Sequence, residues 1–372
     1  MSKIKMFECF AGIGTTSMAM KRLGVNYEVV GIAEIDKFAI QSYMAIHGET
    51  KNYGDISKID PTELPDMDLF TYSFPCQDLS ISGKQRGMGE GTRSGLLYEC
   101  EKVITTKRPK YLLLENVKNL VGKKFKPDFD KWLEWLESQG YSNYWKVLNA
   151  KDYGVPQNRE RVFVVSILGE GAYEFPESFP LEVKLKDILE DEVNEKYYLH
   201  QEYTPQPYSS DSDLQMAGKL AIKGLDCIKR VYSPEGVSPA LTTMQGGQRH
   251  PKIIAMRGSY NSEGKAEQQL EPRKDNLVAE PPEYRIRRLT PLECWRLMGI
   301  DDEDFYKAKS SGISDSQLYK QAGNAIVVDV LVGIFGNLFG QEYYLSHTNE
   351  IDLNDYTFVY ANDVELEHMR GL

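Results

Sequence analysis

The sequence predicts an α/β protein built on a doubly wound, mostly parallel β-sheet, with a second, smaller and loop-rich domain. Three observations predict this class. Short apolar runs alternate with helix-period segments from the N-terminus to Leu168. A glycine-containing turn joins the first apolar run to the first helical pattern. After Leu168 the alternation gives way to a segment punctuated by proline and glycine, which is typical of a separate domain.

Each expected strand is a short run of apolar, β-branched or aromatic residues. Six such runs occupy residues 4–10, 27–33, 69–74, 111–115, 144–149 and 161–166. Helical spacing of apolar residues lies between them, at 15–23, 37–47, 96–106 and 129–139. Strands that alternate with helices pair mainly in parallel and carry helices on both faces of the sheet.

Helical patterning returns near the C-terminus, at residues 290–298 and 324–339. Pro291 suits the first turn of a helix there. We therefore expect one domain made of residues 1–173 and 320–345, and a second made of residues 174–319. Residues 346–372 form a polar, acidic extension to which the sequence assigns no role.

Composition sets limits on the class of protein. The 372 residues are 41% hydrophobic and 27% charged, as in ordinary globular domains. The five cysteines lie far apart with no CxxC pair, so neither a disulfide framework nor a metal site is expected. No run looks apolar and long enough to cross a membrane, and the N-terminus reads directly into a strand rather than a signal peptide. A cytoplasmic protein fits these features.

Charge is unevenly distributed along the chain. The net charge of −11 argues weakly against a polyanionic partner, because local fields matter more than the sum. Acidic residues concentrate at 187–195 and 342–367. Basic residues cluster elsewhere, at 84–86, 248–250 and 285–288. A basic cleft in an acidic protein is compatible with this pattern.

A cysteine and a glutamate follow two of the expected strands. Cys76 lies in Ser73-Phe74-Pro75-Cys76-Gln77, and Glu115 follows Tyr111-Leu112-Leu113-Leu114. A thiolate can attack an electron-poor ring carbon, while a carboxylic acid protonates the ring nitrogen that collects the charge. Taken alone, Cys76 fits a small buried hydrophobe and Glu115 fits a helix cap. Together with the glycine turn, the pair favours chemistry on a pyrimidine.

The glycine turn, Phe10-Ala11-Gly12-Ile13-Gly14, opens a helix and lets the backbone approach a ligand. Glu34 comes 22 positions after Gly12, at the end of the second strand, where a carboxylate can hold a ribose diol. Asp55 and Ile56 can flank an adenine. The set predicts an adenosyl cofactor without separating a nicotinamide dinucleotide from S-adenosylmethionine.

In this order the segments resemble the bacterial-type DNA (cytosine-5)-methyltransferases. The matching segments run from the glycine turn to the C-terminal helices: Phe10-Ala11-Gly12-Ile13-Gly14; Glu34; Asp55-Ile56; Phe74-Pro75-Cys76-Gln77; Glu115-Asn116-Val117; Gln157-Asn158-Arg159-Glu160-Arg161; Arg288-Leu289-Thr290 through Gly299; and Gln321-Ala322-Gly323-Asn324. Their ordered combination is specific, although each piece alone is not. The resemblance implies a Rossmann-like, S-adenosylmethionine-dependent methyltransferase domain with a target-recognition domain.

The resemblance also implies catalytic roles. Cys76 would attack C6 of a cytosine, and Glu115 would bind and protonate N3. Arg161 would hold the carbonyl oxygen of the base, and Arg159 would lie near the backbone of the target. The cytosine has to be flipped out of duplex DNA, because C6 cannot be reached inside the stack. The segment 78–96, rich in glycine and basic residues, suits a mobile lid over the site.

Further site residues follow from the same resemblance. The cofactor would contact Phe10, Ala11, Gly12, Ile13, Gly14, Glu34, Ile35, Asp55, Ile56, Pro75, Leu96, Asn324 and Ala325. DNA would contact Ser80, Ser82, Lys84, Arg86, Gln248 and Arg249. Recognition of the target would lie in residues 174–284, where Val237-Ser238-Pro239-Ala240-Leu241-Thr242-Thr243 resembles the landmark of the recognition domain. Gln248 and Arg249 can read bases in the major groove, and a solvated loop is an equally good interpretation.

Two positions depart from the family pattern. Ala325 stands where a serine is usual, and Glu8 stands where an aspartate is frequent, which affects the cofactor pocket rather than the chemistry. An RNA cytosine-5 methyltransferase is the alternative enzyme, but Phe74 precedes Pro75 and the variable segment is long, so DNA is favoured. A catalytically inactive DNA-binding module and a nicotinamide oxidoreductase are further alternatives. We expect a monomer of bacterial or phage origin that acts on double-stranded DNA, with a cognate restriction endonuclease as a separate partner left open.

Overall fold

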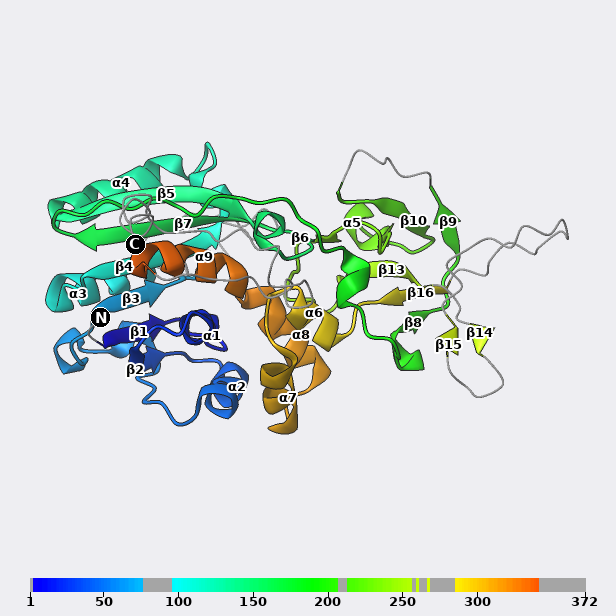
Figure 1. Cartoon of the computed structure of the whole chain (residues 1–372), viewed down its shortest axis with the longest axis horizontal. Helices are drawn as coiled ribbons and strands as arrows, with labels where there is room; N and C mark the ends of the chain where they lie inside the picture. Colours follow the sequence, from blue (N-terminus) through cyan, green and yellow to red (C-terminus); the bar gives the residue numbers. More distant parts are fainter. Residues whose placement is uncertain are drawn as a thin grey trace, which may run out of the picture.

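The computed structural model describes residues 3–75, 96–206, 213–255, 259–260, 266–267 and 285–340. Two six-stranded sheets lie toward opposite ends of an elongated molecule, and the helices α6 (Pro291–Arg296), α7 (Asp302–Ser310) and α8 (Asp315–Asn324) lie between them (Figure 1). All six strands expected in the N-terminal part are present, and all six belong to the first sheet.

The first sheet has the order β2-β1-β3-β4-β7-β5. These strands are β1 (Ile4–Cys9), β2 (Tyr27–Ala33), β3 (Leu69–Tyr72), β4 (Tyr111–Val117), β5 (Tyr141–Asn149) and β7 (Glu160–Leu168). Strand β1 is parallel to β2 and β3, and β3 is parallel to β4. Strand β7 runs antiparallel to both β4 and β5. The sheet is therefore parallel over four strands and antiparallel at one side.

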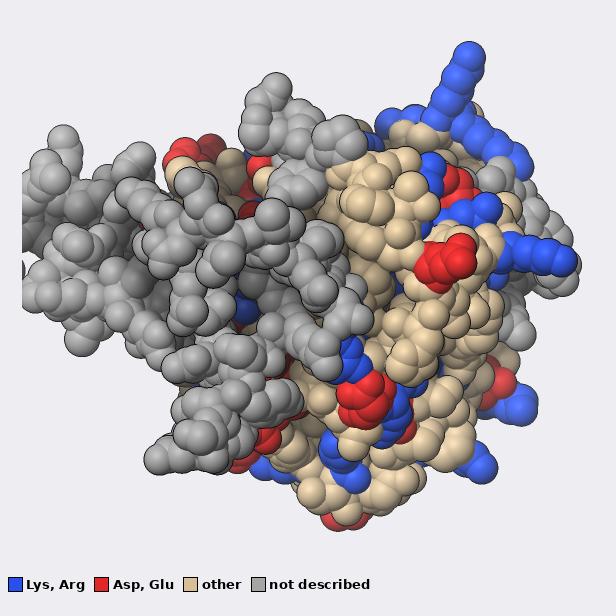
Figure 2. Space-filling model, turned by 90° about the vertical axis from the view of Figure 1, so that its right-hand side faces the viewer, with Lys and Arg blue, Asp and Glu red and all other residues tan. Residues whose placement is uncertain are grey.

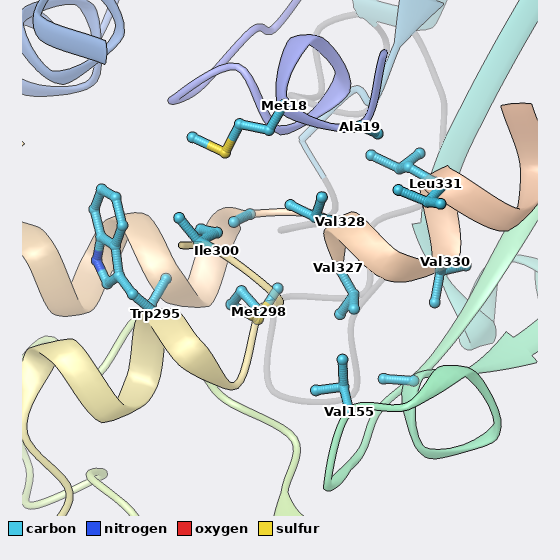
Figure 3. Close-up of a cluster of buried hydrophobic side chains, with 14 of the residues drawn as sticks. Met18, Ala19, Val155, Trp295, Met298, Ile300, Val327, Val328, Val330 and Leu331 are labelled. Atoms are coloured by element: carbon cyan, nitrogen blue, oxygen red, sulfur yellow. The ribbon is translucent and has the colours of Figure 1, made fainter. Parts of the chain in front are cut away.

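Side chains alternate between the two faces of this sheet, as the period of a strand requires. Met6, Leu69, Leu113 and Phe163 point to one face, and Phe7, Phe70, Leu112 and Val164 point to the other. Helices α1 (Thr15–Arg22) and α9 (Val328–Phe339) cover the first face; α3 (Leu97–Lys107) and α4 (Lys126–Ser138) cover the second. Figure 3 shows Met18 and Ala19 of α1 beside Val328 and Leu331 of α9. The sheet is thus doubly wound.

The second sheet is smaller and built from short strands. Its order is β8-β16-β13-β11-β10-β9, with a core of Leu220, Val231 and Ile286. The strands are β8 (Tyr198–Leu199), β9 (Tyr203–Pro205), β10 (Met216–Leu220), β11 (Arg230–Tyr232), β13 (Lys252–Ala255) and β16 (Arg285–Arg288), with helix α5 (Asp226–Lys229) between β10 and β11. A pair outside this sheet, β14 (Ser259–Tyr260) and β15 (Ala266–Glu267), is antiparallel. This part falls within the segment after Leu168 for which a separate, loop-rich domain is expected.

Helices α6 to α8 contact the first sheet's helices directly. Between α6 and α7, the carbonyl of Gly299 and the side chain of Asp301 accept hydrogen bonds from Arg22 of α1 at 2.7 Å and 3.0 Å. Arg22 also donates to Asp329 of α9 at 2.8 Å. Helix α7 packs on α2 (Lys37–His47), whose N-terminus is capped by the side chain of Asp36. The domain limits expected from the sequence stay a prediction, and these contacts favour grouping α6 to α8 with the first sheet.

One stretch, Asp315–Phe339, is by length and composition apolar enough to span a membrane, although none was expected. In the structure 78% of its most apolar window is buried, and residues 325–327 interrupt it between α8 and α9. Such burial is typical of the core helix of a globular protein. Helix α9 packs on α1 and on the first sheet.

Candidate active site

The glycine turn lies between β1 and α1, and its backbone is unusual. Phe10, Gly12 and Gly14 have φ values of 57°, 56° and 78°. A side chain on Gly14 would place its Cβ 2.4 Å from Nε2 of His47, so packing against α2 requires glycine there. A Cβ on Gly12 would meet no atom within 4 Å. The backbone of Gly12 therefore faces open space that a ligand can approach.

Glu34 organises this turn. Its carboxylate accepts hydrogen bonds from the amide of Gly12 at 2.9 Å and from the amides of Ile35 and Asp36 at 2.8 Å. A carboxylate has about four acceptor positions, so it can still accept a hydroxyl. Ile35, beside it, is 72% exposed, an unusual exposure for a large aliphatic side chain. The pair offers a polar acceptor next to an apolar surface.

Asn52 holds Glu34 in place, and it was absent from the expected site. Its side chain donates to the carbonyl of Glu34 at 3.0 Å and accepts from the amide of Glu34 at 3.1 Å. The same oxygen accepts from the amide of Gly54, directly before Asp55, at 2.9 Å. Asn52 joins the first sheet through a single bridge to Ile32, too short a pairing to leave a sequence pattern.

Asp55 and Ile56 are brought near Glu34 by this asparagine. Asp55 caps the short helix η1 (Ile56–Lys58), accepting from the amide of Ser57 at 3.1 Å and from its hydroxyl at 2.8 Å. The hydroxyl of Ser57 in particular lowers the pKa of Asp55. Ile56 is buried. Asp55 therefore remains ionised at the rim while Ile56 packs beneath it.

Glu8 lies under the glycine turn in the buried interior. It accepts hydrogen bonds from the hydroxyl of Ser17 at 2.8 Å and from the hydroxyl of Tyr43 at 2.5 Å. Burial and the nearby Glu8 charge raise the pKa of Tyr43, which stays a neutral donor. Glu8 thus links α1 to α2 behind the turn, which explains how the longer acid is accommodated at this position.

Glu115 on β4 and Arg161 on β7 form the centre of a second group of candidate site residues, apart from the glycine turn. Glu115 on β4 faces Phe163 on β7, and Val117 faces Arg161, so Glu115 and Arg161 are diagonal neighbours on one face of the sheet. Nε of Arg161 lies 3.1 Å from Oε1 of Glu115. Glu115 is 9% exposed, and burial raises its pKa despite the opposing charges of Arg161 and Arg159.

Asn116 ties this pair to the proline turn. Its buried side chain donates to the carbonyl of Phe74 at 3.0 Å. The chain that enters Pro75 is therefore fixed beside the residue that follows Glu115. Leu96 and Pro75 are half-buried at the two edges of the described chain around this point. Cys76 itself lies outside the described residues, as do Ser80, Ser82, Lys84 and Arg86.

Arg159 is enclosed rather than presented at the surface. It is 3% exposed and donates to the carbonyls of Leu241 at 2.9 Å, Gly323 at 3.1 Å and Ala325 at 3.0 Å. Its expected position near the backbone of the target stays a prediction, and this burial favours a positioning role. The carbonyls belong to the recognition landmark and to the end of α8, so Arg159 joins both to β7.

Gln157 and Gly323 complete this junction. Gln157 is fully buried, donates to the carbonyl of Leu297 at 2.5 Å and accepts from the amide of Leu241 at 2.9 Å. A Cβ on Gly323 would lie 2.1 Å from the carbonyl oxygen of Thr242. Asn324 is exposed beyond that contact, whereas Ala325 is buried. Ala325 fits this place because a serine hydroxyl would need a partner there.

A family model described as C-5 cytosine-specific DNA methylase matches residues 4–340. The chain belongs to this family. It is therefore a DNA (cytosine-5)-methyltransferase, and the family implies S-adenosylmethionine as methyl donor.

Relatives of this methyltransferase include proteins of bacteria and phages. It is 37% identical to the orphan methyltransferase M.SPBetaI of Bacillus phage SPbeta, over 91% of this chain and 98% of that one. It is 37% identical to the type II methyltransferase M2.ScrFI of Lactococcus lactis subsp. cremoris, over 90% and 99%. It is 32% identical to the type II methyltransferase M.HhaI of Haemophilus parahaemolyticus, over 90% and 94%.

Solved structures agree on the fold of the methyltransferase. The Entamoeba histolytica methyltransferase EhMeth superposes with a TM-score of 0.65 at 18% identity, covering 91% of this chain and 98% of that one. The S. pombe Dnmt2 methyltransferase gives a TM-score of 0.62 at 17% identity, with the same coverage. At such identities the likeness supports the architecture alone.

The methyltransferase carries its candidate base-reading residues on the second sheet's side of the molecule. Gln248 and Arg249 lie in the exposed segment 245–249 that precedes β13. Figure 2 looks onto the outer end of the part that carries the second sheet, where Lys and Arg side chains gather on one part of the described surface. A protein with a net charge of −11 thus still presents basic side chains at this end.

Proposed function

We propose that this enzyme flips a cytosine out of double-stranded DNA and methylates its C5 through a covalent adduct with Cys76. The single observation that carries this proposal is the Glu115 carboxyl. This carboxyl is buried and its pKa is raised, and Nε of Arg161 lies 3.1 Å from its Oε1. The neighbouring Asn116 donates a hydrogen bond to the carbonyl of Phe74, in the turn that leads to Cys76. A structural ion pair would explain the contact with Arg161 but not the link to the proline turn.

The chemistry assigns one step to each residue. The thiolate of Cys76 adds to C6 of the flipped base, and Glu115 gives its proton to N3 as charge moves onto the ring. C5 then becomes nucleophilic. Arg161 holds the Glu115 carboxyl and the carbonyl oxygen of the base. Once C5 carries the methyl group, loss of the C5 proton to solvent and departure of the Cys76 thiolate restore the aromatic ring. N3 returns its proton to the Glu115 carboxylate, and the free enzyme is regenerated.

S-adenosylmethionine supplies, when bound, the activated methyl group that C5 receives. The residues at the glycine turn fit it: Gly12 faces open space, Glu34 keeps acceptor capacity for a ribose hydroxyl, and Ile35 exposes an apolar side chain. The proposed contacts also include Phe10, Ala11, Ile13, Gly14, Asp55, Ile56, Pro75, Leu96, Asn324 and Ala325. A metal is not part of the proposal.

Recognition of the target is proposed to lie in residues 174–284, with Gln248 and Arg249 as candidate base readers. Ser80, Ser82, Lys84 and Arg86 are proposed to contact DNA around the flipped base. The relatives include both orphan and type II methyltransferases. We therefore propose two possibilities for this enzyme: it acts alone, or it is accompanied by a restriction endonuclease that acts separately. We expect it to act as a monomer in the cytoplasm of a bacterium, from a bacterial or phage gene.

Replacement of Cys76 by alanine tests the mechanism, because no other residue is proposed to form the C6 adduct. We expect Cys76→Ala to abolish incorporation of labelled methyl groups and covalent trapping on 5-fluorocytosine DNA, with cofactor binding retained. A matched control is Cys227→Ser, a cysteine on the exposed helix α5. Methyl transfer or an adduct in Cys76→Ala would refute the assignment.

A further inference from the structure

The segment that carries Gln248 and Arg249 ends at a buried lysine. Lys252 is the first residue of β13 and only 3% exposed. Its Nζ donates to the carbonyl of Gln248 at 2.7 Å and to the carbonyl of His250 at 3.1 Å. In the described part of the chain no carboxylate makes a salt bridge with it. An ammonium held in this way fixes two successive points of one loop.

Such a lysine costs stability, which makes its presence informative. Burial lowers the pKa of Lys252 to about 8, because the charged form has lost its contact with water. An apolar side chain of similar length would fill the same space without that cost. Only a hydrogen-bond donor at this position can bind the carbonyls of Gln248 and His250.

The loop is held at other points as well. Gln248 has a φ of 55°, a left-handed conformation uncommon for a residue other than glycine. The ring of His250 packs edge-on against Tyr319 of α8, with centroids 4.4 Å apart. The backbone of residues 248–250 is thus directed inward, toward Lys252 and α8, while the side chains of Gln248 and Arg249 remain exposed.

We propose that Lys252 is a positioning residue for sequence recognition: its ammonium fixes the backbone of residues 248–250 and so orients Gln248 and Arg249 toward base edges. The proposal rests on the proposed reading of DNA by this loop. Lys252 does not touch the DNA in this scheme. Its contribution is the discrimination between the correct and a wrong target, not the chemical step.

The test compares Lys252→Met with Lys102→Met, which removes an exposed lysine of α3 paired with Glu99. Genome-wide methylation mapping with the wild type first defines the consensus. The quantity measured is the ratio of kcat/KM on the correct duplex to kcat/KM on duplexes with one altered base pair. Loss of one well-placed base contact corresponds to a fall of about tenfold or more in this ratio. We expect that fall for Lys252→Met, with cofactor affinity and melting temperature maintained, and an unchanged ratio for Lys102→Met.

A second measurement uses the native side chain, so it stands even where Lys252→Met fails to fold. The same ratio should decrease between pH 7 and pH 9, as the ammonium loses its proton with a pKa of about 8. Burial and the charges of Arg288 and Lys252 lower the pKa of His250 to about 4, so it stays neutral throughout, and burial raises the pKa of Tyr319. The guanidinium groups of Arg249 and Arg288 are the other charged groups around this loop. The Cys227 thiol on α5 is also nearby, so the profile is recorded in a Cys227→Ser background.

The outcomes distinguish the positioning role of Lys252 from the reading of DNA by the loop. A ratio unchanged both in Lys252→Met and at pH 9 would overturn the role of Lys252. If Arg249→Ala relaxes the consensus in the same series, the loop still reads DNA and only the positioning role is lost. If Arg249→Ala also leaves the consensus intact, the proposed base reading by this loop fails with it.

Discussion

Burial and charge act in opposite directions on the carboxyl of Glu115. Burial raises its pKa, and the guanidinium groups of Arg161 and Arg159 oppose that rise. Because the rise prevails, the carboxyl holds its proton to a higher pH than an exposed glutamate would. This is the state that a donor to N3 of cytosine needs, and it arises from the position of the residue on β4 rather than from the residue type.

Glu115→Gln keeps the size and hydrogen-bonding ability of the side chain but cannot transfer a proton. We expect methyl transfer to fall by about 10²- to 10⁴-fold, the usual contribution of a general acid, with cofactor affinity unchanged. For the wild type, kcat/KM should decrease as pH rises through the raised pKa of Glu115, because the acid form is then lost. Single-turnover methylation across pH measures both. Glu160→Gln, at an exposed glutamate paired with Lys118, is the control.

Glu34→Ala should weaken S-adenosylmethionine binding. The ribose loses a charged acceptor and the amide of Gly12 loses its partner, which together cost about 1.5–3 kcal/mol, or roughly 10- to 150-fold in affinity. Calorimetric titration with the cofactor measures this. Asp60→Ala, which removes the cap of the exposed helix η2 (Pro61–Glu63), serves as control. An unchanged dissociation constant would assign Glu34 a purely structural role.

At the scale of elements, local pattern predicted the strands and several helices well. The helix expected at 37–47 matches Lys37–His47, and the strand at 27–33 matches Tyr27–Ala33. The helix expected at 324–339 proved to be α9, preceded by a break at 325–327, and neither α7 nor α8 before its last residue was predicted. Helix α7 has few apolar residues, because much of its surface is exposed, so its sequence carries little periodicity.

Pairing between elements was harder to foresee. The antiparallel direction of β7 depends on contacts with β4 and β5, which no local run of residues specifies. The same holds at the site: Glu115, Arg161 and Glu34 stood out by type and order, whereas Asn52 acts through hydrogen bonds to backbone groups of another strand. The enclosure of Arg159 likewise follows from tertiary contacts alone.

The close approach of Gly323, at the end of α8, to the backbone of Thr242 can be tested by mutation. Alanine is ordinarily preferred to glycine in a helix, by roughly 0.5–1 kcal/mol. At Gly323, however, the added Cβ would lie 2.1 Å from the carbonyl oxygen of Thr242, so the recognition landmark has to move. We expect Gly323→Ala to lower the free energy of unfolding by about 1–3 kcal/mol. Urea denaturation measures it, with Ser316→Ala on the exposed face of α8 as control. A stabilised variant would contradict the close approach.

At the scale of the whole molecule, Arg159 connects parts that are distant in the sequence. Arg159→Met leaves three carbonyls without their donor, and we expect the free energy of unfolding to fall by about 2–4 kcal/mol. A contact with a DNA phosphate would predict instead a shallower dependence of DNA affinity on salt, with stability intact. Thermal denaturation and DNA binding at several salt concentrations distinguish the two roles.

The order of elements along the chain has a consequence for synthesis on the ribosome. One face of the first sheet is covered by α9, yet β7 ends at Leu168 and α9 begins at Val328. At about 5–20 residues per second, the intervening chain takes on the order of 8–30 s to emerge. During that interval the apolar face that α9 will cover lacks its helix, and the nascent chain is a natural client for chaperones. A fragment ending near residue 173 should accordingly aggregate, and co-expression of residues 285–372 should restore some of it to solution.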